Sequence, residues 1–347
     1  MNERLPFSCD YLQGCHPAIL EKFQESNLEA CDGYGSDPYT LKAKELILKA
    51  CELKDGEVQL LSGGTQANLI VIAAALQRYQ AVISADTGHI NCHEGGSIES
   101  SGHKILALPH HYGKISAQQL EEYMKTFTAD ANNEHMAQPA LVYISQPTEY
   151  GTLYCAEELR KIHEVCEQYG LLLYADGARL AYALASPAND VSLPLLAKYC
   201  DIFYIGGTKC GALLGEAVVF NRKGLIPHFF TTVKQMGGIL AKGKVLGIQF
   251  AALFEDDLYL KIGKDAVSYA DEIRLFLKTN GWLLLFDCPT NQIFVIMEDE
   301  KLKKLGEKVS YSFWEKHDDT HTVIRLATSW ATTRENVNDL LSIIEEL

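Results

Sequence analysis

The sequence predicts an α/β protein that is built on a largely parallel sheet with helices on both faces, followed by a smaller α+β domain. Two observations support this fold class. Short apolar runs alternate with helical patterns up to about residue 220, and after Gly243 the predicted strands are separated by polar, charge-rich segments instead. A chain of 347 residues is long enough to bury both cores. We therefore predict a large domain over residues 1–245 and a small domain over residues 246–347.

The elements of the large domain follow from apolar runs and helical spacing. The first forty residues contain turn signals and are predicted to be irregular. A short apolar run begins at Val58, before a glycine turn, and buried strands are predicted at residues 81–85, 104–108, 140–145, 171–175, 202–205 and 217–220. Helices are predicted at residues 39–53, from Thr65 onward, and at 117–126, 156–169 and 193–199. Sheets of this kind bind ligands at the carboxyl ends of their strands.

The small domain mixes helices and strands. Helical spacing predicts one helix through residues 250–259 that runs on to a second at 267–278. Strands follow at residues 282–286, 292–298 and 322–328, and a last helix begins at Arg334.

Charge and composition exclude several classes of function. The formal net charge is −14 without basic clusters, which argues against nucleic acid or an anionic membrane as a partner. The amino terminus lacks the apolar run of a signal peptide, and the longest apolar stretch, residues 69–76, is too short to span a bilayer. Ten cysteines are scattered singly without a C-x-x-C pair. We therefore expect a cytoplasmic protein with reduced thiols and without a metal site.

Lys209 lies at the end of a predicted buried strand, after two glycines. An ammonium in that position must be paired, desolvated with a lowered pKa, or covalently engaged, and the last two make a lysine nucleophilic. Asp176 directly follows another apolar run, and Arg179 comes three residues later. An Asp that caps the next helix, with a surface Arg, is the alternative. The glycine turn before Thr65 places free backbone N–H groups at a helix start, which is an anion site.

Three motifs in order carry a resemblance to a known family. Gly63-Gly-Thr65-Gln-Ala-Asn68, Asp176-Gly-Ala-Arg179 and Gly207-Thr-Lys209 resemble the fold-type-I enzymes that use pyridoxal 5'-phosphate, specifically the threonine aldolase branch of the β-eliminating lyase family. The resemblance runs from Ser8 to Arg325. It implies an aspartate aminotransferase-like large domain with a mostly parallel seven-stranded sheet, and pyridoxal phosphate as the cofactor.

The resemblance also implies roles for the residues around the cofactor. Lys209 would bind the cofactor covalently, and Asp176 would keep its ring nitrogen protonated, so that the ring withdraws electrons. Arg179 would lie near the phenolic oxygen.

Other residues would hold the phosphate. Gly64 and Thr65 would bind it at the helix start, and Thr208 would add a hydroxyl. Where the bacterial branch has an arginine on the phosphate side, Lys234 or Lys242 is the candidate substitute.

A histidine stacks on the cofactor ring in this family, with a glutamate a few positions later. His89 and Glu94 match that pattern, so we choose His89 over His93. Glu149 lies in a segment that family members bring close to the substrate. The base that takes the substrate's hydroxyl proton is therefore His89, Glu149 or a water between them.

Arg325 interrupts an apolar strand, and a buried guanidinium needs a carboxylate from the protein or from a ligand. The resemblance assigns it the substrate carboxylate, with Ser8 assisting, and a structural salt bridge is the alternative. Tyr34 lies in a turn similar to one that, in the family, reaches the site across a subunit interface. The resemblance thus implies a homo-oligomer, a tetramer built as a dimer of dimers.

The activity implied is a carbon–carbon lyase of amino acid metabolism. It would cleave L-threonine, L-allo-threonine and other β-hydroxy-α-amino acids to glycine and an aldehyde. A β-eliminating lyase of the tyrosine phenol-lyase or tryptophanase type is the nearest alternative. A nucleotide site at Gly63 would need the absent G-x-G-x-x-G pattern. A purely structural protein would not need Lys209, Asp176 and Arg325 together.

Overall fold

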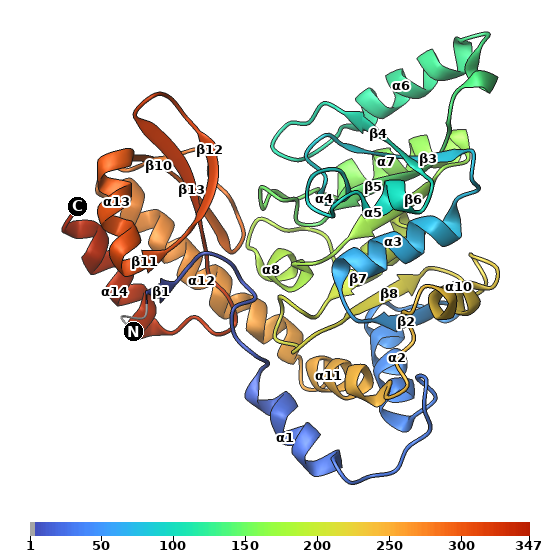
Figure 1. Ribbon diagram of the computed structural model, residues 1–347, viewed down its shortest axis with the longest axis horizontal. Helices are drawn as coiled ribbons and strands as arrows, with labels where there is room; N and C mark the ends of the chain where they lie inside the picture. Colours follow the sequence, from blue (N-terminus) through green and yellow to red (C-terminus); the bar gives the residue numbers. More distant parts are fainter. Residues whose placement is uncertain (1–3) are drawn as a thin grey trace.

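The computed structural model describes residues 4–347, so the first three residues of the predicted large domain lie outside the described part. A large sheet with helices on both faces forms one side of the molecule, and a smaller sheet with its own helices forms the other (Figure 1). Both ends of the described chain lie beside the smaller sheet. The long helix α12 (Leu258–Thr279) runs between the two parts and packs on both.

The large sheet has seven strands in the order β2-β8-β7-β6-β5-β3-β4. All neighbouring pairs from β7 to β4 are parallel, and only β8 runs antiparallel to its neighbours β7 and β2. Each strand coincides with a predicted apolar run, so the mostly parallel seven-stranded sheet is confirmed. The strands are β2 (Glu57–Leu61), β3 (Gln80–Ala85), β4 (Lys104–Leu108), β5 (Gln138–Ser145), β6 (Leu172–Asp176), β7 (Ile202–Gly206) and β8 (Glu216–Phe220).

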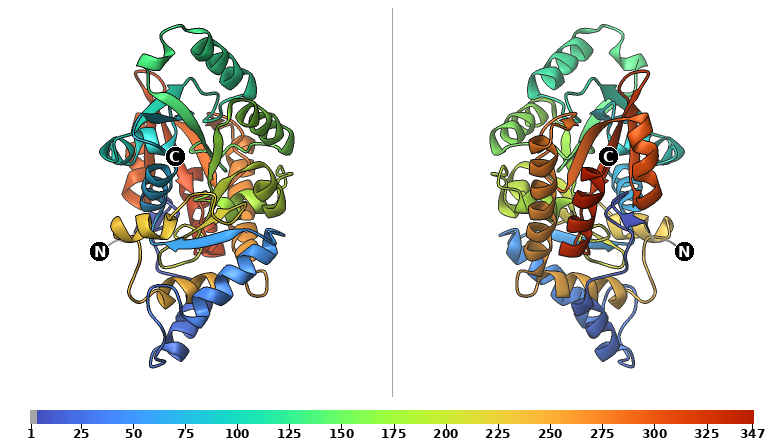
Figure 2. Two further views of the ribbon diagram at one scale, coloured as in Figure 1. Left: turned by 90° about the vertical axis from the view of Figure 1, so that its right-hand side faces the viewer. Right: turned by 90° about the vertical axis from the view of Figure 1, so that its left-hand side faces the viewer.

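Both faces of this sheet are buried, which is why its strands are continuous apolar runs. In β5, Leu141 and Tyr143 face one apolar core, and Val142 and Ile144 face the other. The first core is covered by α3 (Gly64–Ala75), α4 (His89–Cys92), α5 (Ser97–Ser100) and α10 (Phe229–Gln235). The second is covered by α1 (Pro17–Ser26), α2 (Pro38–Ala50), α6 (Ala117–Ala129), α7 (Ala156–Tyr169), α8 (Leu180–Ala185), α9 (Leu193–Tyr199) and α11 (Lys244–Phe254). In side view, α1 and α2 (blue) lie at one end of the molecule and α6 at the other (Figure 2).

The smaller sheet is antiparallel, in the order β12-β13-β10-β9. A short parallel pair joins the amino-terminal segment to this part of the molecule, because Leu5 pairs with Val309 and Pro6 with Ser310. The predicted division at 245/246 falls at the start of α11 and stays a prediction. The remaining elements are β1 (Leu5–Pro6), η1 (Asn133–His135), β9 (Leu283–Leu284), β10 (Gln292–Glu298), α13 (Asp299–Lys308), β11 (Val309–Ser310), β12 (Ser312–Lys316), β13 (His321–Ala327) and α14 (Arg334–Glu345).

Two sequence predictions were wrong. The first forty residues contain α1, which His16 caps by accepting the Ala18 N–H at Nδ1. Only Ile19 and Ser26 are buried in this helix, so its apolar periodicity is weak. The pair of helices predicted at residues 250–259 and 267–278 is also divided elsewhere. Helix α11 spans Lys244–Phe254, and α12 begins at Leu258, after Asp256 and Asp257, which have positive φ angles of 52° and 57°.

No helix within residues 4–347 has both the length and the apolarity of a membrane span. All ten cysteines are free thiols.

Candidate active site

A cavity of about 380 Å³ opens at the carboxyl ends of the large sheet's central strands. Ser145 ends β5, Asp176 ends β6, and Lys209 follows β7, so the fold brings these positions to one edge. Among the residues that line it are eight of those predicted from the sequence: Gly64, Thr65, His89, Glu149, Asp176, Arg179, Thr208 and Lys209.

The Asp176 carboxylate is buried and accepts three hydrogen bonds, which leaves an acceptor site for a ligand. Its Oδ2 accepts from Tyr143 Oη at 2.6 Å and from Asn68 Nδ2 at 3.0 Å, and its Oδ1 accepts from the Ala178 N–H at 3.0 Å. Burial alone would raise the pKa of Asp176, but the charge of His89 and these hydrogen bonds outweigh it and lower the pKa. Asp176 is therefore an anion held in a fixed orientation.

Asn68 links this carboxylate to the histidine. The same Nδ2 donates to Glu94 Oε1 at 2.7 Å, and Glu94 also bonds His89 Nδ1 at 2.8 Å. Glu94 is buried and therefore fixes the orientation of the His89 ring. His93 also lines the cavity, with its ring centroid 5.7 Å from that of His89.

Lys209 presents an unpaired amine to the cavity. Within residues 4–347, its Nζ forms no hydrogen bond or ion pair, and it lies 5.8 Å from the centroid of the Tyr11 ring. Burial, and then the charge of Arg179, lowers the pKa of Lys209, although Asp10 and Asp176 act in the opposite direction. A lysine with a lowered pKa carries more of the nucleophilic free amine at neutral pH.

The start of α3 forms an anion cradle. Gly63 is its N-cap residue, and no side chain caps the helix, so the first N–H groups are free for a ligand. A Cβ at Gly63 would meet nothing within 4 Å, which shows open space at the backbone. Neither Lys234 nor Lys242 lines the cavity, and Lys234 Nζ lies 4.3 Å from the Tyr34 ring centroid instead.

Glu149 has one carboxylate oxygen bonded and one free. Its Oε1 accepts from the His89 N–H at 3.0 Å and from Ser145 Oγ at 2.8 Å. Its Oε2 is buried and has no hydrogen-bond partner in the described part of the chain. Burial raises the pKa of Glu149. Glu149 therefore lines the cavity with one acceptor oxygen that no described residue occupies.

Arg325 projects from β13 and meets no carboxylate among the described residues. Its Nη1 donates to Gln292 Oε1 at 3.1 Å, and its Nη2 donates to the Ser8 carbonyl at 3.2 Å and to Ser312 Oγ at 3.2 Å. Its Nε is buried without a partner in residues 4–347. Arg325 and Ser8 are thus in contact through the Ser8 backbone, and their roles toward a substrate stay a prediction. Neither residue lines the cavity itself.

Tyr34 does not reach this cavity within one chain. It has a φ of 59°, is 51% exposed, and lines a separate hollow beside Phe230.

Two buried carboxylates were not predicted from the sequence. Asp10 forms a two-point ion pair with Arg179, at 2.6 Å from Nε and 3.0 Å from Nη2, and accepts from Asn291 Nδ2 at 2.9 Å. Glu216 lines the cavity and bonds the segment that carries Lys209. Glu216 directly precedes the apolar run at residues 217–220, which is a usable signal, whereas Asp10 lies in a polar segment that gives none.

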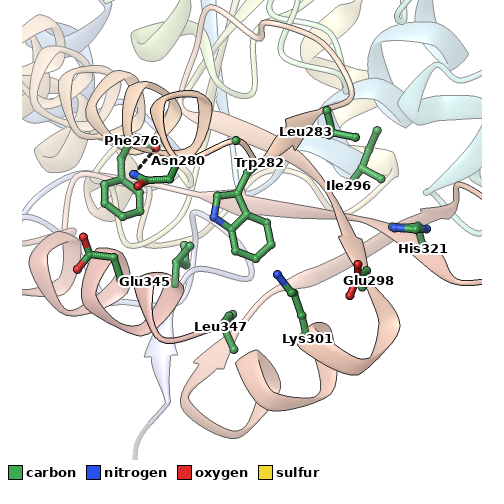
Figure 3. A pocket seen from close by; sticks show the side chains of 12 residues that line it. Phe276, Asn280, Trp282, Leu283, Ile296, Glu298, Lys301, His321, Glu345 and Leu347 are labelled. Atoms are coloured by element: carbon green, nitrogen blue, oxygen red, sulfur yellow. Dashed lines mark hydrogen bonds between the residues drawn. The ribbon is translucent and has the colours of Figure 1, made fainter.

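A second cavity of about 370 Å³ lies in the small domain, between α12, α13, α14 and β10 (Figure 3). Lys301 Nζ lies there 4.7 Å from the centroid of the Trp282 ring. None of its lining residues belongs to the first cavity.

Comparisons with known proteins converge on one family. The family model described as beta-eliminating lyase matches residues 9–307. The low specificity L-threonine aldolase of Pseudomonas aeruginosa is 28% identical to this chain, and the alignment covers 96% of this chain and 95% of that enzyme. The low specificity L-threonine aldolase of Pseudomonas sp. NCIMB 10558 is 29% identical, and the alignment covers 97% of this chain and 96% of that enzyme. The structure of Leishmania major threonine aldolase superposes with a TM-score of 0.95 at 38% identity, over 98% of each chain. A double mutant of Thermus thermophilus aspartate aminotransferase shares the fold, with a TM-score of 0.72 at 13% identity. The superposition covers 99% of this chain and 91% of the aminotransferase.

Proposed function

The chain belongs to the beta-eliminating lyase family, and we propose on that basis that it is a pyridoxal phosphate-dependent threonine aldolase. It cleaves L-threonine, L-allo-threonine and other β-hydroxy-α-amino acids to glycine and an aldehyde. The observation that carries this proposal is the convergence of Lys209, Asp176 and the uncapped start of α3 on one cavity. They provide an amine for covalent attachment of the cofactor, an anion for its ring nitrogen and an anion cradle for its phosphate.

The cavity residues fit the cofactor. Bound pyridoxal phosphate supplies a protonated ring that withdraws electrons from the bond to be broken. Lys209 would hold it covalently, and Asp176 would accept a hydrogen bond from the ring nitrogen and keep it protonated. The His89 ring, oriented by Glu94, would stack on the cofactor, and Arg179 would lie near its phenolic oxygen.

The phosphate would bind at the start of α3. Gly64 and Thr65 provide the backbone N–H groups, and Thr208 adds a hydroxyl from the neighbouring turn.

Arg325 and Glu149 act on the substrate. Arg325, which within residues 4–347 has an unpartnered Nε and no carboxylate partner, binds the substrate's α-carboxylate, and Ser8 assists. The free Oε2 of Glu149 accepts the proton of the β-hydroxyl, either directly or through a water that it shares with His89. Burial raises the pKa of Glu149, which makes it a stronger base than an exposed glutamate.

We also propose a homotetramer, built as a dimer of dimers, in the cytoplasm. Tyr34 is exposed and lies away from the cavity of its own chain, as expected for a residue that completes the site of a neighbouring subunit. The ten free thiols favour a reducing compartment.

The first test uses colour. The purified protein incubated with pyridoxal phosphate develops a visible absorption band, borohydride fixes the cofactor to the chain, and Lys209→Ala loses this covalent attachment. A wild-type protein without the band would refute the cofactor assignment.

The second test separates the two lyase chemistries. Incubation with L-threonine or L-allo-threonine yields glycine and acetaldehyde. Release of pyruvate and ammonia from tyrosine or tryptophan, without threonine cleavage, would instead assign the chain to the β-eliminating branch.

A further inference from the structure

Glu216 is a buried carboxylate in the active-site cavity that the proposed reaction does not use. It is 3% exposed and begins β8, where its backbone pairs with Leu61 on one side and Gly206 on the other. Leu61 is followed by the turn that leads into α3, and Gly206 by the turn that carries Thr208 and Lys209. Glu216 therefore lies between the segment that leads into the anion cradle at the start of α3 and the segment that carries Thr208 and Lys209.

Both carboxylate oxygens of Glu216 are bonded to the second of these segments. Oε1 accepts from Thr208 Oγ at 2.7 Å, and Oε2 accepts from the Gly207 N–H at 3.0 Å. The Thr208 hydroxyl also accepts from the Gly215 N–H at 3.0 Å. A hydroxyl has a single proton to donate, so in this arrangement Thr208 has none left for a phosphate oxygen.

Protonation of Glu216 would free the Thr208 hydroxyl proton for a phosphate oxygen. A protonated Glu216 donates to Thr208 Oγ, which then accepts two hydrogen bonds and can donate its own proton to a phosphate oxygen. The other acceptor within reach of this hydroxyl, the Gly215 carbonyl at 3.5 Å, is a long and weak competitor. It also removes a negative charge from beside the phosphate. Both changes favour a bound phosphate dianion.

The electrostatic surroundings make this protonation accessible near neutral pH. The titratable groups that face Glu216 are Lys209, Asp176, Cys210, Tyr174, Tyr204 and Tyr259. Burial raises the pKa values of the tyrosines and raises that of Cys210 to about 12, so these groups stay neutral. Burial also raises the pKa of Glu216 to about 7, although its two hydrogen bonds and the charge of Lys209 oppose the rise.

We propose that Glu216 takes up a proton from solvent when a phosphate group binds at the start of α3, and that this proton frees the Thr208 hydroxyl to donate to the phosphate. Glu216 is thus a positioning residue that couples cofactor binding to pH. The inference rests on the proposed function, because pyridoxal phosphate is the ligand that brings the phosphate.

The experiment counts protons. Apoprotein is titrated with pyridoxal phosphate and, separately, with pyridoxal, which lacks only the phosphate, by calorimetry near pH 8 in buffers of different ionisation enthalpy. The phosphate, with a second pKa of about 6, is already a dianion at that pH and takes up no proton itself. Wild-type protein takes up about one proton more with pyridoxal phosphate than with pyridoxal. Glu216→Gln shows no such difference, and Glu57→Gln, on the adjacent strand outside the cavity, behaves like the wild type.

A second measurement needs only the wild type. Because binding takes up a proton, affinity falls as pH rises. The Kd of pyridoxal phosphate, relative to that of pyridoxal, therefore increases about tenfold between pH 7 and pH 8.5. This ratio keeps the proposal testable if Glu216→Gln does not fold.

Three outcomes would overturn the inference. The first is covalent attachment at Lys209 without extra proton uptake in the wild type, and the second is extra uptake that persists in Glu216→Gln. Both leave the proposed function intact. The third, absence of any attachment at Lys209, would overturn the proposed function and the inference with it.

Discussion

Arg179 holds Asp10 through two hydrogen bonds that connect positions 169 residues apart in the sequence. Asp10 also accepts from Asn291, so one buried carboxylate joins the amino-terminal segment, the large sheet and the small domain. The guanidinium that borders the cofactor site therefore depends on a segment that precedes every strand of the large sheet.

Asp10→Ala is expected to destabilise the protein strongly. The substitution leaves the buried Arg179 without its partner, which costs about 3–5 kcal/mol in the free energy of unfolding, measured by urea denaturation. Glu157→Ala, which breaks an exposed ion pair with Arg160, is the matched control and should change little. Equal effects of the two substitutions would contradict the importance of burial.

The same pair predicts an acid dependence of stability. Burial would raise the pKa of Asp10, but the charges of Arg179 and Lys209 lower it to about 2. A lowered pKa means that the stabilisation is fully present above the ordinary value of about 3.9 and is lost as pH falls through the folded value. Wild type should therefore lose more stability than Asp10→Asn between pH 5 and pH 2 in urea denaturation. Parallel losses would show that Asp10 does not contribute.

Gly63→Ala is expected to weaken cofactor binding without destabilising the fold. The φ angle of Gly63 is −173°, which any residue adopts, and its Cβ would project into open space beside the cradle. A methyl group there hinders the contacts between phosphate and backbone, so affinity for pyridoxal phosphate falls about tenfold to a hundredfold. Absorbance titration measures the affinity, and thermal melting checks the fold. Gly14→Ala, also with nothing within 4 Å but away from the cavity, is the control and should leave both unchanged.

Glu149→Gln should abolish most threonine cleavage while the cofactor stays attached. Removal of a general base lowers kcat by about a hundredfold to ten-thousandfold. Ser145→Ala provides a finer test, because the Ser145 hydroxyl bonds Glu149 and lowers its pKa. Without that bond the pKa of Glu149 rises, and the acidic limb of the kcat/KM profile moves to higher pH. Full activity in Glu149→Gln would show that Glu149 is not the base and would leave His89 or a water to accept the β-hydroxyl proton.

Arg325→Gln should impair substrate binding more than cofactor binding. Loss of a charged contact with the α-carboxylate lowers kcat/KM for L-threonine by about a hundredfold, and the cofactor's absorption band is retained. Ser312→Ala removes only one neutral partner of Arg325 and should have a much smaller effect. A similar loss of kcat/KM in both variants would indicate that Arg325 stabilises the local structure and does not bind the substrate.

The sequence predicted the sheet and its ligand edge because both leave local patterns. Strands buried on two faces are continuous apolar runs, and polar residues that directly follow such runs meet at one edge of a parallel sheet. Asp176 and Lys209 were found in this way. By contrast, α13 buries only Leu305 and β12 buries no residue, so neither had an apolar pattern to detect.

Contacts between distant segments left no such pattern. Asp10 becomes recognisable as a buried partner only when the fold brings Arg179 to it. The same holds for Asn68, whose amide group joins two carboxylates from separate segments, Glu94 and Asp176. These contacts depend on the three-dimensional arrangement, and no spacing rule along the chain expresses it.

The pairing of β1 with β11 has a consequence for biosynthesis. The Ser310 hydroxyl donates to the carbonyl of Leu5, which lies 305 positions earlier. The strand pair closes a loop that contains the whole large sheet, so it forms only after residues 5 and 310 have both been synthesised and brought together. A nascent chain that stops within the large sheet already contains Lys209 and Asp176 but has no β11 to dock its amino terminus. The segment that carries Ser8 and Asp10 is therefore anchored by β11 only once the chain has been made past Ser310.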